Sequence, residues 1–120
     1  MNKKTLVLGV SLKPYRYSYM AVQRLVNNQF EVVAFGLKSW VVAGITIDTT
    51  LNLYINIHTV TLYVNPKAQQ SYYDYIVSLK PKRVIFNPGT ENPEFYAILT
   101  AHHISYEVAC TLVLLSINQY

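Results

Sequence analysis

The sequence predicts a single Rossmann-like α/β domain, in which a doubly wound, mostly parallel sheet of about five strands carries helices on both faces. Short, fully apolar runs recur along the chain, as they do in strands that are buried on both faces of a parallel sheet. Segments with helical periodicity separate these runs. The chain has 120 residues, the size of one ordinary domain, so we expect residues 1–120 to form one unit.

The first part of the chain has the pattern of a βαβ unit. Residues 4–9 form an aliphatic run that closes on Gly9, and residues 30–36 form a second such run. Between them, Ser18 stands where a helix N-cap belongs, and residues 19–28 have helical periodicity. The apolar face of this helix would use Met20, Ala21, Val22 and Leu25. The unit has the expected length of about 30 residues.

The middle of the chain is less regular. Residues 37–57 hold Gly44 and a polar cluster, so we expect an irregular connection with a short strand or single helical turns. Residues 58–65 are strongly β-forming, and Pro66 ends this strand and opens a helix over about residues 67–79. The apolar face of that helix would use Tyr72, Tyr75, Ile76 and Leu79.

The last third of the chain continues the alternation. We expect a strand at residues 83–87, a helix that starts near Pro93, a strand at residues 104–108, and then a helix or apolar tail. Alternation of this kind indicates parallel strands joined by right-handed crossovers.

Composition and charge argue against several partners. The net charge is +4, but the basic residues are spread along the chain, so we expect no nucleic-acid partner. No apolar run approaches the roughly 20 residues of a membrane span, so we expect no membrane association. The first apolar run is too short for a signal peptide, and no small-residue cleavage site follows it. The single cysteine, Cys110, fits a reducing compartment, and we expect a cytoplasmic protein.

Four loops at the carboxyl ends of the predicted strands are candidates for ligand binding, at residues 9–18, 35–39, 64–67 and 87–92. In the first loop, Gly9 lets the backbone leave the sheet sharply, and the amides that follow can hold a phosphate. Ser11, Ser18 and Arg16 would add side-chain donors. The alternative is that Gly9 only ends a strand, Pro14 stiffens a loop and Ser18 caps a helix.

The second loop argues against NAD. An NAD-binding domain offers an acidic residue about 20 residues past its glycines, to hold the ribose hydroxyls. Here the second strand ends in Phe35 and Gly36, and Lys38 follows. A lysine at this place suits a ligand with an extra ribose phosphate, such as NADP or coenzyme A. The alternative is a lysine that only contacts solvent.

No catalytic group or metal site is evident. The carboxylates show no pairing, and His102 and His103 would point about 100° apart on a helix, which disfavours a shared metal. Cys110 lies in an apolar run and is expected to be a small buried hydrophobe. We therefore expect no metal, and a binding role is favoured over an enzymatic one.

The first loop also carries the pattern Gly-x-Ser-x-x-Pro-x-Arg-x-Ser, at Gly9, Ser11, Pro14, Arg16 and Ser18. In this pattern the chain resembles the small stand-alone CoA-binding-domain proteins of bacteria, which are similar to the N-terminal domain of the succinyl-CoA synthetase alpha subunit and of NDP-forming acyl-CoA synthetases. The stretches DTTLNLYINIHTVTLYVNP, IFNPGTENPE and ACTLVLL also look like that family. The resemblance covers about residues 4–118.

The resemblance implies a Rossmann-type fold that binds coenzyme A or an acyl-CoA and has no catalytic group of its own. The first loop would take the phosphates, the second would approach the adenosine, and the two later loops would line the pantetheine. The implied binding residues are Gly9, Val10, Ser11, Lys13, Pro14, Arg16, Tyr17, Ser18, Phe35, Gly36, Lys38, Val64, Asn65, Pro66, Asn87, Pro88, Gly89 and Thr90.

The chain departs from the family at two places. Relatives often carry a proline after the second strand, which is absent from AFGLK, and an aspartate at the head of the central strand, where this chain has His58. Two other functions stay open: a small NADP-linked oxidoreductase on the same fold, and an interaction protein with a vestigial nucleotide pocket. The sequence is compatible with a monomer or a homodimer.

Overall fold

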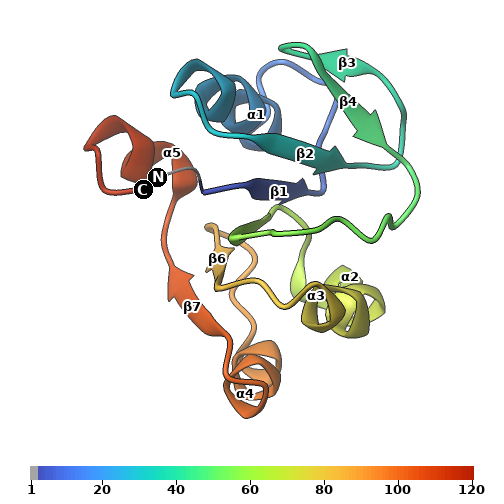
Figure 1. Cartoon of the computed structure of the whole chain (residues 1–120), viewed down its shortest axis with the longest axis vertical. Helices are drawn as coiled ribbons and strands as arrows, with labels where there is room; N and C mark the ends of the chain where they lie inside the picture. Colours follow the sequence, from blue (N-terminus) through green and yellow to red (C-terminus); the bar gives the residue numbers. More distant parts are fainter. Residues whose placement is uncertain (1–2) are drawn as a thin grey trace.

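The computed structural model describes residues 3–120, and within them one sheet has seven strands in the order β3-β4-β2-β1-β5-β6-β7 (Figure 1). Neighbouring strands are parallel except for the antiparallel pair β3 and β4. The strands are β1 (Thr5–Leu8), β2 (Val32–Phe35), β3 (Val41–Val42), β4 (Ile45–Asp48), β5 (Thr59–Leu62), β6 (Arg83–Phe86) and β7 (Ser105–Val108). The Rossmann-like class is confirmed, whereas the expected number of about five strands is too low.

Helices cover both faces of the sheet (Figure 1). One face packs against α1 (Tyr17–Asn27) and α5 (Thr111–Ser116). The other packs against a continuous helical segment and a further helix, namely α2 (Pro66–Gln69), η1 (Gln70–Tyr72), α3 (Tyr73–Leu79) and α4 (Pro93–Ala101). None of the helices in residues 3–120 combines the length and the apolar character that a membrane crossing requires.

Three adjacent strands of the sheet are buried on both faces. Every residue of β1, β5 and β6 is buried, because helices cover both sides of these strands. In β1, Leu6 and Leu8 point to the α3 and α4 side, whereas Val7 points to the α1 and α5 side. Burial on both faces therefore explains the continuous apolar runs in the sequence.

The two additional strands lie in residues 37–57, for which we expected an irregular connection with a short strand or single helical turns. Ala43 and Gly44 have φ of 51° and 79° and form the turn between β3 and β4. Strand β4 then joins β2 in parallel, with Asp48 opposite Phe35. Strand β3 has only two residues and β4 only four, so the apolar signal of this hairpin is too short to stand out.

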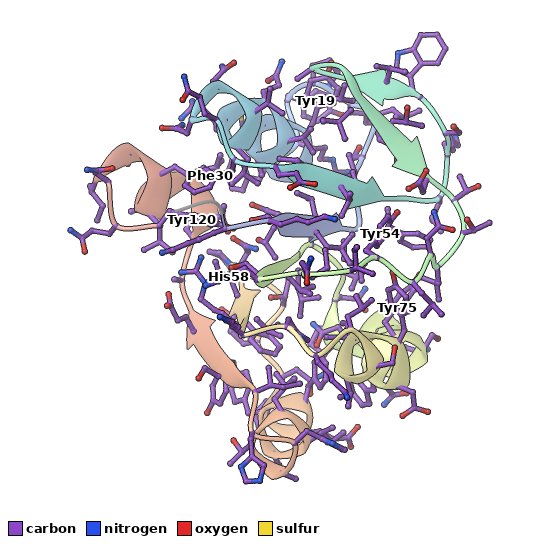
Figure 2. The ribbon with its side chains drawn as sticks, viewed as in Figure 1. Tyr19, Phe30, Tyr54, His58, Tyr75 and Tyr120 are labelled. Carbon is purple, nitrogen blue, oxygen red and sulfur yellow. The ribbon has the colours of Figure 1, made fainter. Side chains whose placement is uncertain are left out.

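After β4 the chain runs from the carboxyl end of the sheet back to its amino end, where β5 begins on the other side of β1. Residues 49–58 make this connection and form no helix. Tyrosine hydroxyls hold this connection in place (Figure 2). Tyr54 donates to the Asp48 carboxylate, and Tyr75 of α3 donates to the main-chain oxygen of Asn52 at 2.5 Å. Burial raises the pKa of Tyr54 and raises the pKa of Tyr75 to about 12, so both hydroxyls keep the protons that they donate at neutral pH.

Tyr120 closes the amino edge of the sheet (Figure 2). Its ring meets Phe30 edge to face at 4.9 Å between centroids, and its hydroxyl lies 2.5 Å from Thr5 Oγ1. The Arg83 guanidinium stacks on the same ring at 4.5 Å. Arg83 Nη1 and Lys3 Nζ donate to the main-chain oxygen of Tyr120 at 3.2 and 2.7 Å. These contacts join the last residue to β1 and β6.

His58 lies beside this group of positive charges, at the start of β5 (Figure 2). Its Nδ1 is 2.8 Å from Thr59 Oγ1. Burial lowers the pKa of His58, and the charges of Arg83, Lys3 and Lys82 lower it further. The imidazole is therefore neutral at neutral pH, and protonation there opposes the neighbouring charges.

We predict that His58 makes the fold acid-sensitive above the range in which carboxylates titrate. The unfolded state takes up a proton on His58 below about pH 6.5, whereas the folded state resists it, so the free energy of unfolding falls as the pH drops from about 7 to 5. Denaturant unfolding of the wild type and of His58→Asn across this interval checks this. The variant should show the smaller decline, and equal declines would contradict the prediction.

Candidate functional site

A pocket of about 730 Å³ opens at the carboxyl end of the sheet, beyond β1, β2 and β5. The chain builds the sheet outward on the β2 side of β1 and then on the β5 side, so the strand order reverses at this point. The pocket is lined by Gly9, Val10, Ser11, Leu12, Lys13, Phe35, Gly36, Leu37, Lys38, Tyr63, Val64, Asn65, Ala68, Ser71 and Tyr72.

Two glycines allow the first loop to pack directly against the second and the third loops of this pocket. Gly9 has φ of +105°, and a Cβ at this position would lie 2.8 Å from Val64 Cγ1 and 3.1 Å from the main chain of Tyr63. A Cβ at Gly36 would lie 2.5 Å from the main-chain oxygen of Val10. Only residues without a side chain therefore fit where the first loop contacts the second and the third.

Hydrogen bonds to β2 and hydrogen bonds of its own serines hold the first loop. The amides of Gly9 and Val10 both donate to the main-chain oxygen of Phe35 at 2.9 Å. The Ser18 hydroxyl accepts from the Ser11 amide at 2.9 Å, and the Ser11 hydroxyl accepts from the Lys13 amide at 3.2 Å. Both serines therefore fix the shape of the loop.

The expectation that Ser18 caps the first helix is wrong. The N-cap of α1 is Arg16, which makes no side-chain capping bond, and Ser18 is buried inside the first turn. There its hydroxyl faces the preceding loop and not the free amides of its own helix. The buried face of α1 consists of Ser18, Ala21, Val22 and Leu25, whereas Met20 is only half-buried.

The third loop leads into α2 as the sequence predicts. Asn65 is the N-cap, and its Oδ1 accepts from the Ala68 amide at 2.9 Å, while Pro66 occupies the first helical turn. Because Asn65, Ala68, Ser71 and Tyr72 follow at helical spacing, they share one side of the segment and line the pocket together.

Gln69 joins the third loop to the fourth. Its side chain is fully buried, and its Nε2 donates to the main-chain oxygens of Val64 and Thr90 at 2.9 and 2.7 Å. Its Oε1 accepts from Asn92 Nδ2 at 2.9 Å. Every polar atom of this amide is thus occupied inside the protein, and the two loops are held at a fixed separation.

The fourth loop lies outside the pocket lining and hydrogen-bonds to β5 and to the start of α5. Asn87 is buried, and its Nδ2 donates to Thr61 Oγ1 at 2.7 Å and to the Leu62 oxygen at 2.8 Å. Its Oδ1 accepts from the Thr111 amide at 2.9 Å. The Thr90 hydroxyl donates to the main-chain oxygen of Asn87 at 2.7 Å. These two side chains point into the protein and are used structurally.

The predicted binding residues therefore divide into two groups. Those that line the pocket are Gly9, Val10, Ser11, Lys13, Phe35, Gly36, Lys38, Val64 and Asn65. Those outside its lining are Pro14, Arg16, Tyr17, Ser18, Pro66, Asn87, Pro88, Gly89 and Thr90. Sequence reasoning missed Leu12, Leu37, Tyr63, Ala68, Ser71 and Tyr72. Helical spacing from Asn65 could have found three of these.

The lining has the chemistry of a site for a partly apolar anion. Lys13 and Lys38 contribute positive charge, and the described residues that line the pocket include no aspartate or glutamate. Asp48 ends the strand beside Phe35, but its carboxylate accepts from Tyr54 and is not part of the lining. Phe35 and Tyr72 meet edge to face at 5.7 Å and form an aromatic wall.

Comparison with known proteins gives two kinds of match. A family model described as a CoA binding domain matches residues 3–116. A solved structure of an uncharacterized protein is 47% identical, covers 100% of this chain and 99% of its own, and has a TM-score of 0.96. The search among curated proteins finds no match.

More distant structures share the fold. A Thermus thermophilus protein is 21% identical, covers 99% of this chain and 91% of its own, and has a TM-score of 0.85. A hypothetical protein from Pyrococcus horikoshii OT3 is 25% identical, covers 93% of this chain and 80% of its own, and has a TM-score of 0.82.

We predict that Gly9→Ala destabilises the fold by roughly 2–4 kcal/mol, because the positive φ is strained for alanine and the added methyl collides with Val64. Gly44→Ala is the matched control, since Gly44 also has positive φ but no atom within 4 Å of an added Cβ. It should cost only about 1 kcal/mol. Denaturant unfolding measures both variants, and equal losses would show that crowding at Gly9 has no effect.

Proposed function

The chain belongs to the CoA-binding domain family, and from this premise we propose that its pocket binds coenzyme A or an acyl-CoA. The observation that supports the proposal most directly is the pocket beyond β1, β2 and β5, which contains two lysines and no carboxylate among its described lining residues. Such a site attracts a polyphosphate, and its apolar walls suit the rest of the ligand.

In this proposal the first loop holds the phosphates. The missing side chain at Gly9 lets the third loop pack against the first, and Gly9, Ser11 and Lys13 line the same pocket. The N-terminus of α1 follows, and its dipole favours negative charge. Arg16 is exposed at that N-terminus, from which its flexible side chain can approach a bound phosphate.

The second loop would hold the adenosine part. Phe35 and Gly36 provide an apolar floor, and Leu37 and Lys38 stand at the rim, with Leu37 87% exposed. Lys38 is the group that would neutralise the phosphate on the ribose. No proline directly follows β2 in this chain, and Leu37 and Lys38 line the pocket at this place.

The third loop would contact the pantetheine. Val64, Asn65 and Tyr72 line the pocket on this side. The residues at 87–90 would act on the ligand indirectly, since Thr90 is joined to the third loop through Gln69. We assign them the role of holding Val64 and Asn65 in place.

The same pocket favours binding over catalysis. Among its described lining residues there is no histidine, cysteine or carboxylate that could serve as nucleophile or general base. We therefore propose a module that holds CoA as a carrier or as a regulatory signal.

We predict that titration calorimetry gives heat with coenzyme A and a weaker response with dephospho-CoA, NADP and NAD. Lys38→Ala should reduce the preference for coenzyme A over dephospho-CoA by about tenfold, because it removes one charge-assisted contact worth roughly 1.5–3 kcal/mol. Lys67→Ala, an exposed lysine on α2 outside the pocket lining, is the control. Absence of heat with both CoA forms would refute the proposed function, and heat with NADP alone would support an oxidoreductase.

We also predict that Arg16→Ala weakens binding of coenzyme A by about tenfold or more, again through the loss of a charge-assisted contact. Arg24→Ala is the matched control, because Arg24 is an exposed arginine in the last turn of the same helix. If the two variants bind coenzyme A equally well, Arg16 has no part in holding the phosphates.

A further inference from the structure

Strand β7 is an open edge of the sheet. It lies at the end of the strand order opposite β3, and all four of its residues are exposed (Figure 1). The other edge of the sheet is formed by β3, a strand of only two residues that belongs to a tight hairpin. Very short edge strands resist pairing with another chain, whereas longer flat ones invite it.

The backbone of β7 presents unpaired groups on its outer side. The Ala109 amide donates to the Phe86 oxygen of β6 at 3.1 Å, so the odd-numbered residues of this segment turn their backbone groups toward β6. Because backbone groups alternate along a strand, Tyr106 and Val108 turn theirs away from β6. The Ile104 amide donates to the Leu99 oxygen at 2.9 Å. The Ile104 carbonyl therefore remains as the outward-facing group of that residue.

This edge also lacks the usual protection against pairing. It contains neither lysine nor proline, and its one charge, on Glu107, lies 3.5 Å from Arg83 Nη1 of β6. Tyr106 is fixed in orientation, because its ring stacks on Tyr96 at 4.4 Å and meets Phe86 edge to face at 5.9 Å. Val108 is 56% exposed. The strand is thus rigid, apolar on one face and open.

We propose that β7 pairs antiparallel with β7 of a second copy of this chain, around a two-fold axis at Tyr106. Each Tyr106 then exchanges hydrogen bonds with Tyr106 of the second copy, and each Val108 amide donates to the Ile104 carbonyl of the second copy. Backbone pairing of this kind joins two sheets edge to edge.

The side chains select this register. With Tyr106 at the axis, Ile104 stands opposite Val108 on one face, and the Ser105 hydroxyl stands opposite the Glu107 carboxylate on the other. A register shifted to place Glu107 at the axis sets the two carboxylates directly opposite each other, which is repulsive. Of these two registers, the one with Tyr106 on the axis avoids this repulsion.

The pairing leaves the candidate site open. The pocket lies beyond β1, β2 and β5, and β6 separates β5 from β7 in the sheet. The strand is only four residues long, so we expect a weak, reversible dimer whose population rises with concentration.

Sedimentation velocity over a concentration series tests the proposal. The wild type should shift from monomer to dimer, and Val108→Pro should stay monomeric, since proline removes the outward amide without touching the odd-numbered bonds to β6. Val108→Thr keeps the amide and should still dimerise. Circular dichroism and a thermal melt show whether Val108→Pro is folded. A wild type that is monomeric up to its solubility limit, or a dimer that a folded Val108→Pro leaves intact, would overturn the proposal.

A charge exchange tests the register without relying on proline. Ser105→Glu places a carboxylate opposite Glu107 of the second copy and should raise the dimer dissociation constant by about tenfold. The double variant Ser105→Glu with Glu107→Ser restores a serine opposite each glutamate and should restore dimerisation. In both variants a glutamate stays close to Arg83, because Ser105 is the register partner of Arg83. A double variant that dimerises no better than the single one would refute this register.

Discussion

The close backbone contacts at Gly9 and Gly36 are the constraint on which the candidate site depends. At both positions a Cβ atom would collide with the neighbouring loop, at Val64 Cγ1 in one case and at the Val10 oxygen in the other. The first loop can therefore lie against the second and the third at once. The pocket forms where these three loops meet, beyond adjacent parallel strands at the point where the strand order reverses. Its shape is set by main chain, and its charge is then supplied by side chains such as Lys13 and Lys38.

Buried amide side chains behind the pocket hold these loops in place through hydrogen bonds. Gln69 and Asn87 each use their amide groups on protein partners in neighbouring loops and strands. In a buried environment, a satisfied network of this kind is rigid, because breaking one bond leaves a polar atom without a partner. The site thus consists of residues that face the pocket and residues that keep those in place. Asn87 and Thr90 belong to the second group, although their place in the sequence suggested the first.

Tyrosine side chains anchor the connection between β4 and β5 and the end of the chain. The connection from β4 to β5 has no helix, and Tyr54 and Tyr75 fasten it to the fold instead. Tyr120 joins the end of the chain to β1 and β6. A tyrosine combines a large apolar ring with one hydrogen-bonding group, so it can pack and anchor at the same time. This use accounts for part of the unusual tyrosine content of the chain.

The sequence by itself determined the fold class, because apolar runs buried on both faces and helical periodicity are local signals that survive without tertiary context. It also located the first loop, since Gly9 and Ser11 form a recognisable pattern, and it identified Pro66 as a helix start. Only the tertiary structure decided the β3–β4 hairpin, whose strands are too short to show a period. It also decided the direction of the Ser18 and Asn87 side chains and the place of Tyr72 in the pocket. Those properties depend on which loops come to lie side by side, and residues far apart in the chain settle them.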